Sequence, residues 1–526
     1  MRLHGKAMLA GGLLAALLPF ACPAGDGVIG NHSPEERAYA QPHSPSRSSG
    51  VWYEIFVRAW YDTDGDGTGD LKGVTAKLDY LQSLGVDGIW LMPINPSPSY
   101  HGYDVTDYRR INPQYGTLAD FHQLIDAAHE RGIRVIMDLV VNHTSDRHPW
   151  FLAARDPGDP HHNWYTWAGP HAQLRATSAT GGPAWHALGR QHYLGTFTGA
   201  MPDLHFDTPA VREAIDDVGR YWLAQGVDGF RLDAAQHVYY DFAAQADDPA
   251  VLRKNLQWWR SFHQAMKQAD PDVYLVGEVT REQPAELEPW FGPLDAVFDF
   301  PLATQLVASA REERPGALNA LLQRLAHAIP TGQDAPFLSN HDQERVMSQL
   351  HGNVQHMRMA AAMLLTLPGQ PFIYYGEELG MRGTKPDPDL REPMRWHRAA
   401  HGPGESRWKR FSAGDGPGVS VDAQQGDAHS LLAWYRMLIG WRHELPVLRE
   451  GALRVPGIAN PSLAGWELDG DGADVLVLHN LSGKPQTLEL ADTLARFGRL
   501  RLASTPDAHL AGGRLHLPPY ATVVLQ

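Results

Sequence analysis

Cysteine is almost absent from the sequence, since Cys22 is the only one among 526 residues. No disulfide can form within the chain. Metal sites built from several cysteines, such as structural zinc sites, are also excluded. Stability therefore has to come from packing, to which a bound metal ion would add.

Basic residues are in deficit: the chain has 45 Lys and Arg against 60 Asp and Glu, a net charge of -15. Nucleic acid is not an expected partner, because its binding depends on Lys and Arg that neutralise phosphates. The composition, with 16 Trp and 18 Tyr, leaves room for a neutral ligand that stacks on aromatic rings.

Long apolar runs are also missing, and no segment reaches the roughly 20 residues of a membrane-spanning helix. The basic start MRLHGK and the apolar run 7–21 match a secretory signal peptide, which we place at residues 1–24. We expect export to the periplasm or the medium, without a membrane span. Lipid anchoring at Cys22 is the alternative, but Pro-Phe-Ala before it is a poor lipoprotein cleavage site. Residues 25–49, rich in Ser, Pro and Gly, predict a flexible spacer.

Short apolar runs then alternate with stretches that carry apolar residues at helical spacing, such as LADFHQLIDAAHERG. The strand candidates are residues 51–60, 86–95, 134–142, 229–235, 273–279, 296–302, 336–342 and 371–380. Eight strand–helix units predict an α/β fold, a closed (β/α)8 TIM barrel.

Two parts of the chain depart from this alternation. Residues 145–205 are crowded with His, Pro, Trp and Gly, which predicts an inserted subdomain after the third strand. Short β-prone segments near the end of the chain, such as ADVLVLHN and ATVVLQ, predict a C-terminal antiparallel β-sandwich. We therefore expect a barrel of residues 50–144 and 206–452, an insertion of residues 145–205, and a C-terminal domain of residues 453–526.

Polar residues gather at the ends of five of the runs, where barrel enzymes carry their chemistry. They are Tyr103 and Asp104 after the second run, Asp138, Asn142 and His143 at the third, Arg231 and Asp233 at the fourth, Glu278 at the fifth, and Asn340, His341 and Asp342 at the seventh. A structural hydrogen bond explains any one of them. A barrel does not need carboxylates on three strand ends for stability, so the cluster indicates acid–base catalysis.

The ordered motifs around these residues resemble the α-amylase family of glycoside hydrolases over most of the chain after the spacer. DLVVNHTS, GFRLDAA, VGEV and FLSNHD are similar to that family's four principal motifs, and MPDLHFD to a further motif in the insertion. The resemblance implies a retaining mechanism in which Asp233 is the nucleophile, Glu278 the general acid/base, and Asp342 the residue that grips the distorted sugar.

The same resemblance implies further contacts around this triad. Arg231 would lie beside the nucleophile and help to keep it ionised, whereas desolvation and nearby negative charge would keep the acid protonated. His143 and His341 would hydrogen-bond hydroxyls of the reacting glucose, and Tyr103 would stack on its ring.

A calcium site is predicted at residues 62–70, where the sequence DTDGDGTGD alternates carboxylates with glycines that permit a sharp turn. Acceptors so closely spaced repel one another without a cation. Gly73 stands where an EF-hand has its bidentate Glu, so a complete EF-hand is excluded. Family resemblance implies that four side chains and the Thr68 carbonyl bind Ca²⁺, the side chains being those of Asp62, Asp64, Asp66 and Asp70.

Resemblance alone implies a second Ca²⁺, held by Asn142, Asp203 and the backbone carbonyl of His237. This ion braces the cleft in the α-amylase branch of the family, whereas many oligosaccharide α-glucosidases lack a suitable residue at the position of His237. The three residues therefore favour an amylase.

The signals for the substrate conflict. MPDLH resembles a group intermediate between oligo-1,6-glucosidases and neopullulanases that includes bacterial α-amylases. HGYD and REPMRW resemble oligosaccharide-acting α-glucosidases, in which the residue at the position of Asp104 helps to close the non-reducing end. The small Ala234 accompanies α-1,4 preference in those enzymes.

We expect a monomer that hydrolyses internal α-1,4 bonds of starch and maltooligosaccharides. An exo-acting α-glucosidase or a transglycosylase on short α-glucosides is the alternative. The complete triad disfavours a non-catalytic binding protein, and no ligand set for zinc is present.

Overall fold

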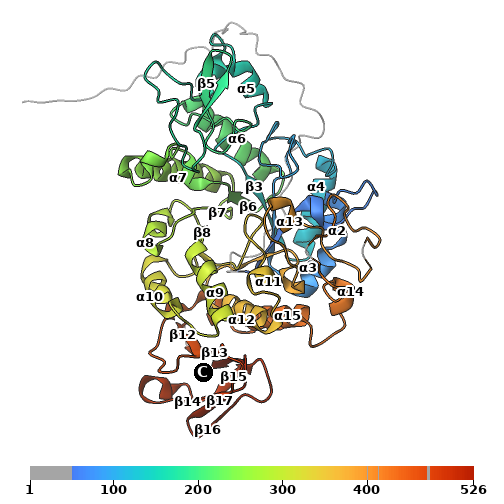
Figure 1. Cartoon of the computed structure of the whole chain (residues 1–526), viewed down its shortest axis with the longest axis vertical. Coiled ribbons are helices and arrows are strands. Elements are labelled where there is room, and N and C mark those ends of the chain that lie inside the picture. Colours follow the sequence, from blue (N-terminus) through green and yellow to red (C-terminus); the bar gives the residue numbers. More distant parts are fainter. Residues whose placement is uncertain (1–49, 400, 413, 471–473) are drawn as a thin grey trace, which may run out of the picture. The chain divides into compact units, whose positions relative to one another are not determined.

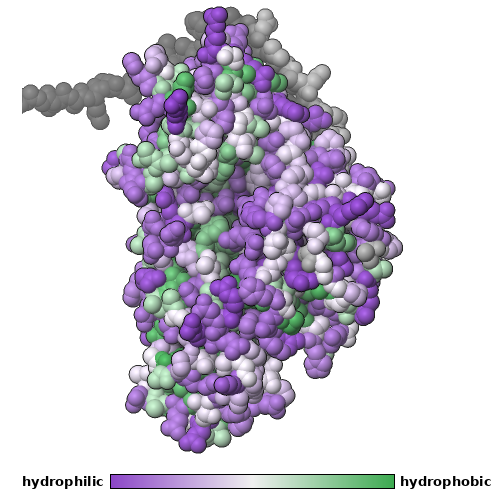
Figure 2. Space-filling model, in the orientation of Figure 1, coloured by the Kyte–Doolittle hydropathy of each residue, from purple (hydrophilic) through white to green (hydrophobic). Residues whose placement is uncertain are grey.

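The computed structural model describes residues 50–399, 401–412, 414–470 and 474–526. The predicted signal peptide and spacer, with Cys22, lie outside these residues. In the described part, no helix combines the length and apolar character needed to cross a membrane. Figure 2 shows hydrophilic residues over most of the face drawn, with apolar residues scattered among them.

Eight parallel strands form one sheet in the order β10-β1-β2-β3-β6-β7-β8-β9. Their bounds are β1 (Trp52–Ile55), β2 (Gly88–Leu91), β3 (Arg134–Leu139), β6 (Gly229–Leu232), β7 (Tyr274–Gly277), β8 (Ala296–Phe298), β9 (Asp334–Ala335) and β10 (Phe372–Tyr374). A parallel bridge between Phe337 and Phe372 joins the two ends of this order. The predicted (β/α)8 barrel is confirmed.

Helices follow the strands and pack on the outside of the sheet, where α12 contacts both α9 and α15 (Figure 1). The α-helices are α1 (Val57–Trp60), α2 (Leu71–Ala76), α3 (Leu78–Leu84), α4 (Leu118–Glu130), α5 (Pro149–Ala154), α6 (Pro209–Ala224), α7 (Pro249–Ala269), α8 (Pro284–Leu287), α9 (Phe300–Glu312), α10 (Leu318–Ala328), α11 (Val346–Gln349), α12 (Val354–Thr366), α13 (Asp387–Leu390), α14 (Val421–Gln424), α15 (Leu431–Glu444) and α16 (Val447–Glu450). Short 3-10 turns are η2 (Pro160–Trp164), η3 (Ala235–His237), η4 (Ala243–Gln245), η5 (Glu288–Trp290), η6 (Glu377–Leu379) and η7 (Asp492–Arg496).

Local sequence explains where the helices begin and end. Thr117 caps α4 in a capping box, because its hydroxyl accepts from the Asp120 N–H at 3.2 Å while the Asp120 carboxylate accepts from the Thr117 N–H at 2.9 Å. Asp248 caps α7, whose first residue is Pro249. Gly85 ends α3 in the left-handed region with φ of 93°, a conformation that glycine adopts without strain.

Each of the predicted strands ends earlier than its apolar run suggests. The first stops at Ile55 and the buried run continues as α1, since an all-apolar run does not distinguish a strand from a buried helix. The eighth stops at Tyr374 and is followed by η6. The seventh prediction, residues 336–342, was wrong in its bounds: β9 covers Asp334–Ala335, and beyond Pro336, which has no N–H, pairing is limited to the isolated bridge between Phe337 and Phe372.

The chain has two smaller β regions, one inserted between barrel strands and one after the barrel. A hairpin of β4 (Trp185–Leu188) and β5 (Gln191–Leu194) lies between β3 and β6. The C-terminal strands are β11 (Ala452–Arg454), β12 (Leu463–Asp469), β13 (Val475–Asn480), β14 (Gln486–Glu489), β15 (Leu500–Ala503), β16 (His509–Ala511), β17 (Arg514–Leu517) and β18 (Thr522–Leu525). They form antiparallel sheets of five and three strands around a shared apolar core, which confirms the predicted sandwich class.

Large apolar side chains fill the barrel, so its two ends do not communicate. Trp52, Trp90, Phe298, Phe337 and Phe372 belong to one buried cluster, and Phe372 stacks on Trp52 at 5.8 Å between ring centroids. A packed interior leaves the two rims of the barrel as separate surfaces.

Candidate active site

Backbone pairing at the ends of the central strands positions two of the predicted catalytic residues. Asp233 follows β6, and its N–H donates to the Leu139 carbonyl at 3.2 Å. Glu278 follows β7, and its N–H donates to the Leu232 carbonyl at 3.0 Å. Both carboxylates therefore continue the hydrogen-bonding of the rigid sheet rather than sitting on free loops.

The Arg231 guanidinium joins three carboxylates in one buried network. Its Nη1 lies 2.6 Å from Asp233 Oδ1 and 3.0 Å from Asp138 Oδ1, and its Nη2 lies 2.8 Å from Glu278 Oε2. The β3–β6 register pairs Asp138 with Arg231, which brings these two side chains together. Only 1% of the Arg231 side chain is exposed, so these ion pairs are shielded from water.

Burial raises the pKa of Glu278, and the neighbouring Asp233 and Asp342 raise it further, while Arg231 acts in the opposite sense. Burial also raises the pKa of Asp233, against the influence of Arg231. The guanidinium touches both carboxylates, so it does not by itself distinguish the predicted nucleophile from the predicted acid. Glu278 has one further contact, because its Oε2 accepts from the Ala234 N–H at 2.9 Å. This hydrogen bond lowers the pKa of Glu278 and so acts against burial.

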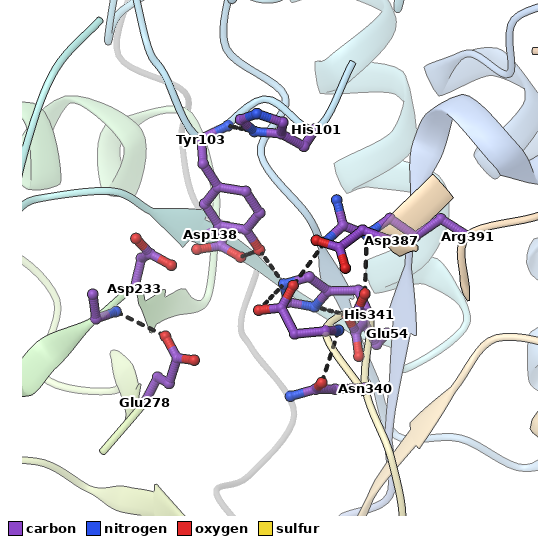
Figure 3. A network of polar contacts seen from close by, with 12 residues as sticks. Glu54, His101, Tyr103, Asp138, Asp233, Glu278, Asn340, His341, Asp387 and Arg391 are labelled. Atoms are coloured by element: carbon purple, nitrogen blue, oxygen red, sulfur yellow. Dashed lines mark hydrogen bonds and ion pairs between the residues drawn. The ribbon is translucent and has the colours of Figure 1, made fainter. Parts of the chain in front are cut away.

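A chain of hydrogen bonds runs from Asp138 through Tyr103 and His341 to Glu54, as Figure 3 shows. The Tyr103 hydroxyl donates to Asp138 at 3.0 Å and lies 2.7 Å from Nε2 of His341, whose Nδ1 lies 2.5 Å from Glu54 Oε1. With the phenol proton directed to Asp138, the phenol oxygen and Glu54 are both acceptors for His341, and this arrangement favours a proton on each imidazole nitrogen. Burial alone would lower the pKa of His341, but Asp342 and Glu54 raise it above its usual value.

Asp342 lies beside His341 and forms an ion pair with Arg391. Its Oδ1 is 2.7 Å from Arg391 Nη2, and its Oδ2 is 3.3 Å from His341 Nε2. Burial would raise the pKa of Asp342, but His341 and Arg391 outweigh it and hold this pKa below its usual range. The Asp342 side chain is 48% exposed, unlike Asp233 at 11%, so it is accessible to a ligand.

Sequence reasoning missed Glu54 and Arg391 as site residues. Glu54 lies inside the first apolar run, where a charged residue that is 1% exposed in a strand was itself a signal. Arg391 begins the REPMRW segment, but only the path of the loop after β10 brings it to Asp342.

Two predicted substrate contacts are already engaged with protein atoms. His143 is buried, its Nε2 lies 3.0 Å from the Tyr103 carbonyl oxygen, and burial lowers its pKa to about 4. Asp104 is also buried, and its Oδ1 accepts hydrogen bonds from the hydroxyls of Ser97 and Ser99.

A pocket of about 380 Å³ adjoins Glu278 on the side of the inserted segment. Phe197 and Thr180 from the insertion line it together with Tyr240 and Arg281 from the loops after β6 and β7. The pocket therefore offers room for a ligand group next to the predicted acid/base.

The predicted calcium loop brings three of its four aspartates together. One oxygen from each of Asp62, Asp64 and Asp70 lies within 4.8 Å of the others, which suits a hard cation with oxygen ligands. Gly65 and Gly67 have φ of 83° and 94°, so the turn uses backbone that glycine adopts without strain.

Asp66 and Thr68 differ in placement from this group. The Asp66 carboxylate is exposed and outside the cluster, and it accepts from the Thr68 N–H at 2.6 Å. All four aspartates accept backbone N–H groups of the same loop, but Asp66 alone among them lies outside the cluster that fits a Ca²⁺ ion.

The residues of the predicted second calcium site fit less well. Asn142 donates to Asp203 Oδ1 at 3.3 Å, and the Thr196 N–H donates to Asp203 Oδ2 at 2.9 Å, so both carboxylate oxygens already have protein donors. The His237 carbonyl accepts from the Tyr240 N–H at 3.2 Å. Burial raises the pKa of Asp203 to about 7, although the hydrogen bonds from Thr196 and Asn142 act in the opposite sense.

Comparison with known proteins places this geometry in a family. Residues 54–451 match the family model described as "Alpha amylase, catalytic domain", and residues 463–524 match the "Alpha-amylase SusG C-terminal domain". Alpha-amylase 3 of Dictyoglomus thermophilum is 36% identical over 92% of this chain and 94% of its own. A trehalose synthase/amylase of Mycolicibacterium smegmatis is 33% identical over 84% of this chain and 85% of its own.

Solved structures agree with the sequence relatives. The crystal structure of an α-amylase from H. orenii superposes with a TM-score of 0.83 at 42% identity, covering 91% of this chain and 99% of that one. The family model spans residues 54–451, which include the carboxylate network. The chain therefore belongs to the α-amylase family of glycoside hydrolases and is a glycoside hydrolase.

Proposed function

We propose that the protein is a retaining endo-hydrolase of α-1,4-glucosidic bonds in starch and maltooligosaccharides, active as a monomer. The observation that carries this proposal is the contact of one guanidinium, that of Arg231, with both Asp233 and Glu278. A retaining mechanism requires its two carboxyl groups to be close, about 5 to 5.5 Å apart, and a shared guanidinium supports such an arrangement.

In the proposed mechanism, the Glu278 carboxyl protonates the glycosidic oxygen while the Asp233 carboxylate attacks the anomeric carbon. Glu278 then takes a proton from water, which attacks the glycosyl-enzyme from the same face as the departed group, and the α configuration is retained. Asp342, the accessible carboxylate held ionised by His341 and Arg391, would hold hydroxyls of the distorted ring and favour the transition state.

Endo action is supported by the position of Asp104. Its carboxylate is buried and bonded to Ser97 and Ser99, so it does not extend to close the non-reducing end of the substrate. The pocket beside Glu278 supplies space for sugar units beyond the cleaved bond. Ala234, next to Asp233, is small and accords with α-1,4 preference.

A time course of products from soluble starch and maltotriose tests the proposal. Mixed oligosaccharides should appear early from starch, and glucose released alone from chain ends would refute endo action. Glu278→Gln should lower kcat by about 10² to 10⁴-fold as the proton donor is lost. Glu282→Gln, an exposed glutamate in the same loop, is the matched control and should keep full activity.

Transglycosylation is a second candidate because a relative 33% identical to this chain is named a trehalose synthase/amylase. The same carboxylates serve both reactions, and a sugar hydroxyl then takes the place of water. Incubation with maltotriose separates the two outcomes, since products longer than the substrate appear only when the glycosyl group is transferred.

We also propose that Ca²⁺ binds the loop at residues 62–70 through Asp62, Asp64 and Asp70. The ion would neutralise three carboxylates and fix the loop that leads into α2, a structural role. The second calcium site, at Asn142, Asp203 and His237, stays a prediction.

Export of the protein is a further proposal, based on the predicted signal peptide in residues 1–24. N-terminal sequencing of protein recovered from the periplasm or medium tests it, because an intact Met1 would contradict cleavage. Size-exclusion chromatography with light scattering tests the monomer.

A further inference from the structure

The amino-terminal end of the barrel carries a polar pocket of about 310 Å³, on the opposite rim from the catalytic carboxylates. Arg134 and Tyr274, the first residues of β3 and β7, line it, while Asp138 and Glu278 stand at the other ends of these strands. Tyr274 and Glu278 are four residues apart, about 13 Å along a strand. The aromatic cluster inside the barrel separates the two sites.

Two buried donor atoms of this pocket have no hydrogen-bond partner among the residues that the structure describes. Arg134 is 6% exposed and lies over the Trp52 ring at 4.6 Å, and its Nη2 makes no hydrogen bond among the described residues. Tyr274 is 5% exposed and stacks on the same indole at 5.1 Å, and its hydroxyl also lacks a partner there. Leaving a buried donor unpaired is costly, so both groups favour a ligand that accepts hydrogen bonds.

Trp52 fixes the geometry of this pair. Its ring holds both side chains, and its Nε1 donates to Gln370 Oε1 at 3.2 Å, which places another amide at the pocket wall. The two donors are therefore held in place before any ligand arrives, and binding does not have to order them.

The remaining lining groups identify the class of ligand. The Lys267 ammonium lies 3.2 Å from Asp295, so this cation is already balanced. Gln333 offers a carbonyl oxygen without a partner in the described part of the chain, and Glu450 adds a carboxylate. The ligand has to accept at the guanidinium and the phenol and donate at the amide oxygen, and hydroxyl groups do both.

We propose that this pocket is a second, non-catalytic carbohydrate site that binds a neutral mono- or disaccharide. A small oxyanion would satisfy the two donors but would lie beside the carboxylates of Asp295 and Glu450, which disfavour it. The volume of about 310 Å³ is near the lower limit for ligand pockets, so a long glucan does not fit inside. The choice of ligand does not depend on which bond the catalytic site cleaves.

Calorimetric titration with maltose tests the proposal in the Glu278→Gln background, which keeps the sugar intact. We expect two binding events, of which one weakens about tenfold or disappears when Tyr274→Phe or Gln333→Leu is added. Tyr274→Phe removes only an unpartnered oxygen and keeps the ring on Trp52, so folding should be unaffected. Gln333→Leu, in the loop before β9, gives an independent answer.

The control variant is Tyr221→Phe on α6, which should bind maltose as the background does. In the active protein, Tyr274→Phe and Gln333→Leu should leave kcat/KM on maltotriose within about twofold of the unmodified enzyme, since the pocket is remote from the catalytic rim. A single maltose-binding event that neither substitution changes would overturn the proposal. Binding of inorganic phosphate or acetate at this pocket in preference to maltose would overturn it as well.

Discussion

The substitution Glu54→Gln removes the charge that holds His341 protonated. The Glu54 carboxylate accepts from His341 Nδ1 at 2.5 Å, and neither side chain is more than 2% exposed. Glutamine keeps the shape and can still accept one hydrogen bond, so the change acts mainly on the charge. In this variant His341 should lose its second proton at a lower pH than in the unmodified protein. It should then no longer donate a hydrogen bond to Tyr103.

The size of the effect follows from the difference between a charged and a neutral hydrogen bond. A bond to an ionised group contributes about 1.5 to 3 kcal/mol and a neutral one about 0.5 to 1.5 kcal/mol. The difference of roughly 1 to 1.5 kcal/mol corresponds to about one pKa unit for His341. The pKa of His341 is raised in the folded protein, so its stabilisation is complete below the unfolded value of about 6.5 and is lost as pH rises through the folded pKa.

Denaturant unfolding at several pH values between about 5.5 and 9 measures this effect. Glu54→Gln should destabilise most at the acid end of the range, and its cost should shrink by roughly 1 kcal/mol towards the alkaline end. Glu405→Gln is the matched control, because this buried carboxylate accepts from the backbone N–H groups of Trp396, His397 and Gly402. A cost for Glu54→Gln that is independent of pH would show that His341 is neutral and refute the reasoning.

Three further substitutions or treatments have defined outcomes. Arg391→Lys removes the close contact with Asp342 at 2.7 Å and should lower kcat/KM on maltotriose by about 10 to 100-fold, with circular dichroism unchanged. Chelation of Ca²⁺ should lower the thermal midpoint, and Asp64→Asn should abolish this response; a midpoint that ignores both calcium and chelator would contradict the loop site. Thr117→Ala breaks the capping box of α4 and should cost about 1 kcal/mol in denaturant unfolding with kcat unchanged, whereas a loss of activity alone would contradict a purely structural role.

The sequence predicted those parts of the site that depend on strand ends. Asp233 and Glu278 terminate apolar runs, and parallel strands bring such ends to one rim whatever the loops do. Arg391 could not be placed in this way, since it reaches Asp342 through a loop that has no periodic pattern. The Asp104 side chain shows the same difficulty: its position in the motif was clear, but its bonds to Ser97 and Ser99 depend on the local turn.

Strand bounds were predicted less well than strand order. Apolar runs continue past the paired residues because the segments after the strands are also buried, as Phe56 and Trp60 are. Hydrophobicity reports burial rather than hydrogen-bonding, so it does not mark the residue at which the sheet ends.

The network of carboxylates around Arg231 also explains how the proposed active site can hold a proton. Asp138, Asp233 and Glu278 share a single guanidinium, which balances only one negative charge. Burial raises the pKa of Asp138 to about 7, although Arg231 opposes the rise. Burial raises the pKa of Asp233 and of Glu278 as well. Carboxyl groups that interact this closely titrate as a coupled set, so a proton taken up here is shared by the network rather than held by one residue. Asp138 is 1% exposed and is bonded to Trp90 and Tyr103, so it cannot pass that proton to a substrate. Glu278 adjoins an open pocket, so in the proposed mechanism Glu278 rather than Asp138 delivers the proton to the leaving group, while Asp233 attacks as the carboxylate.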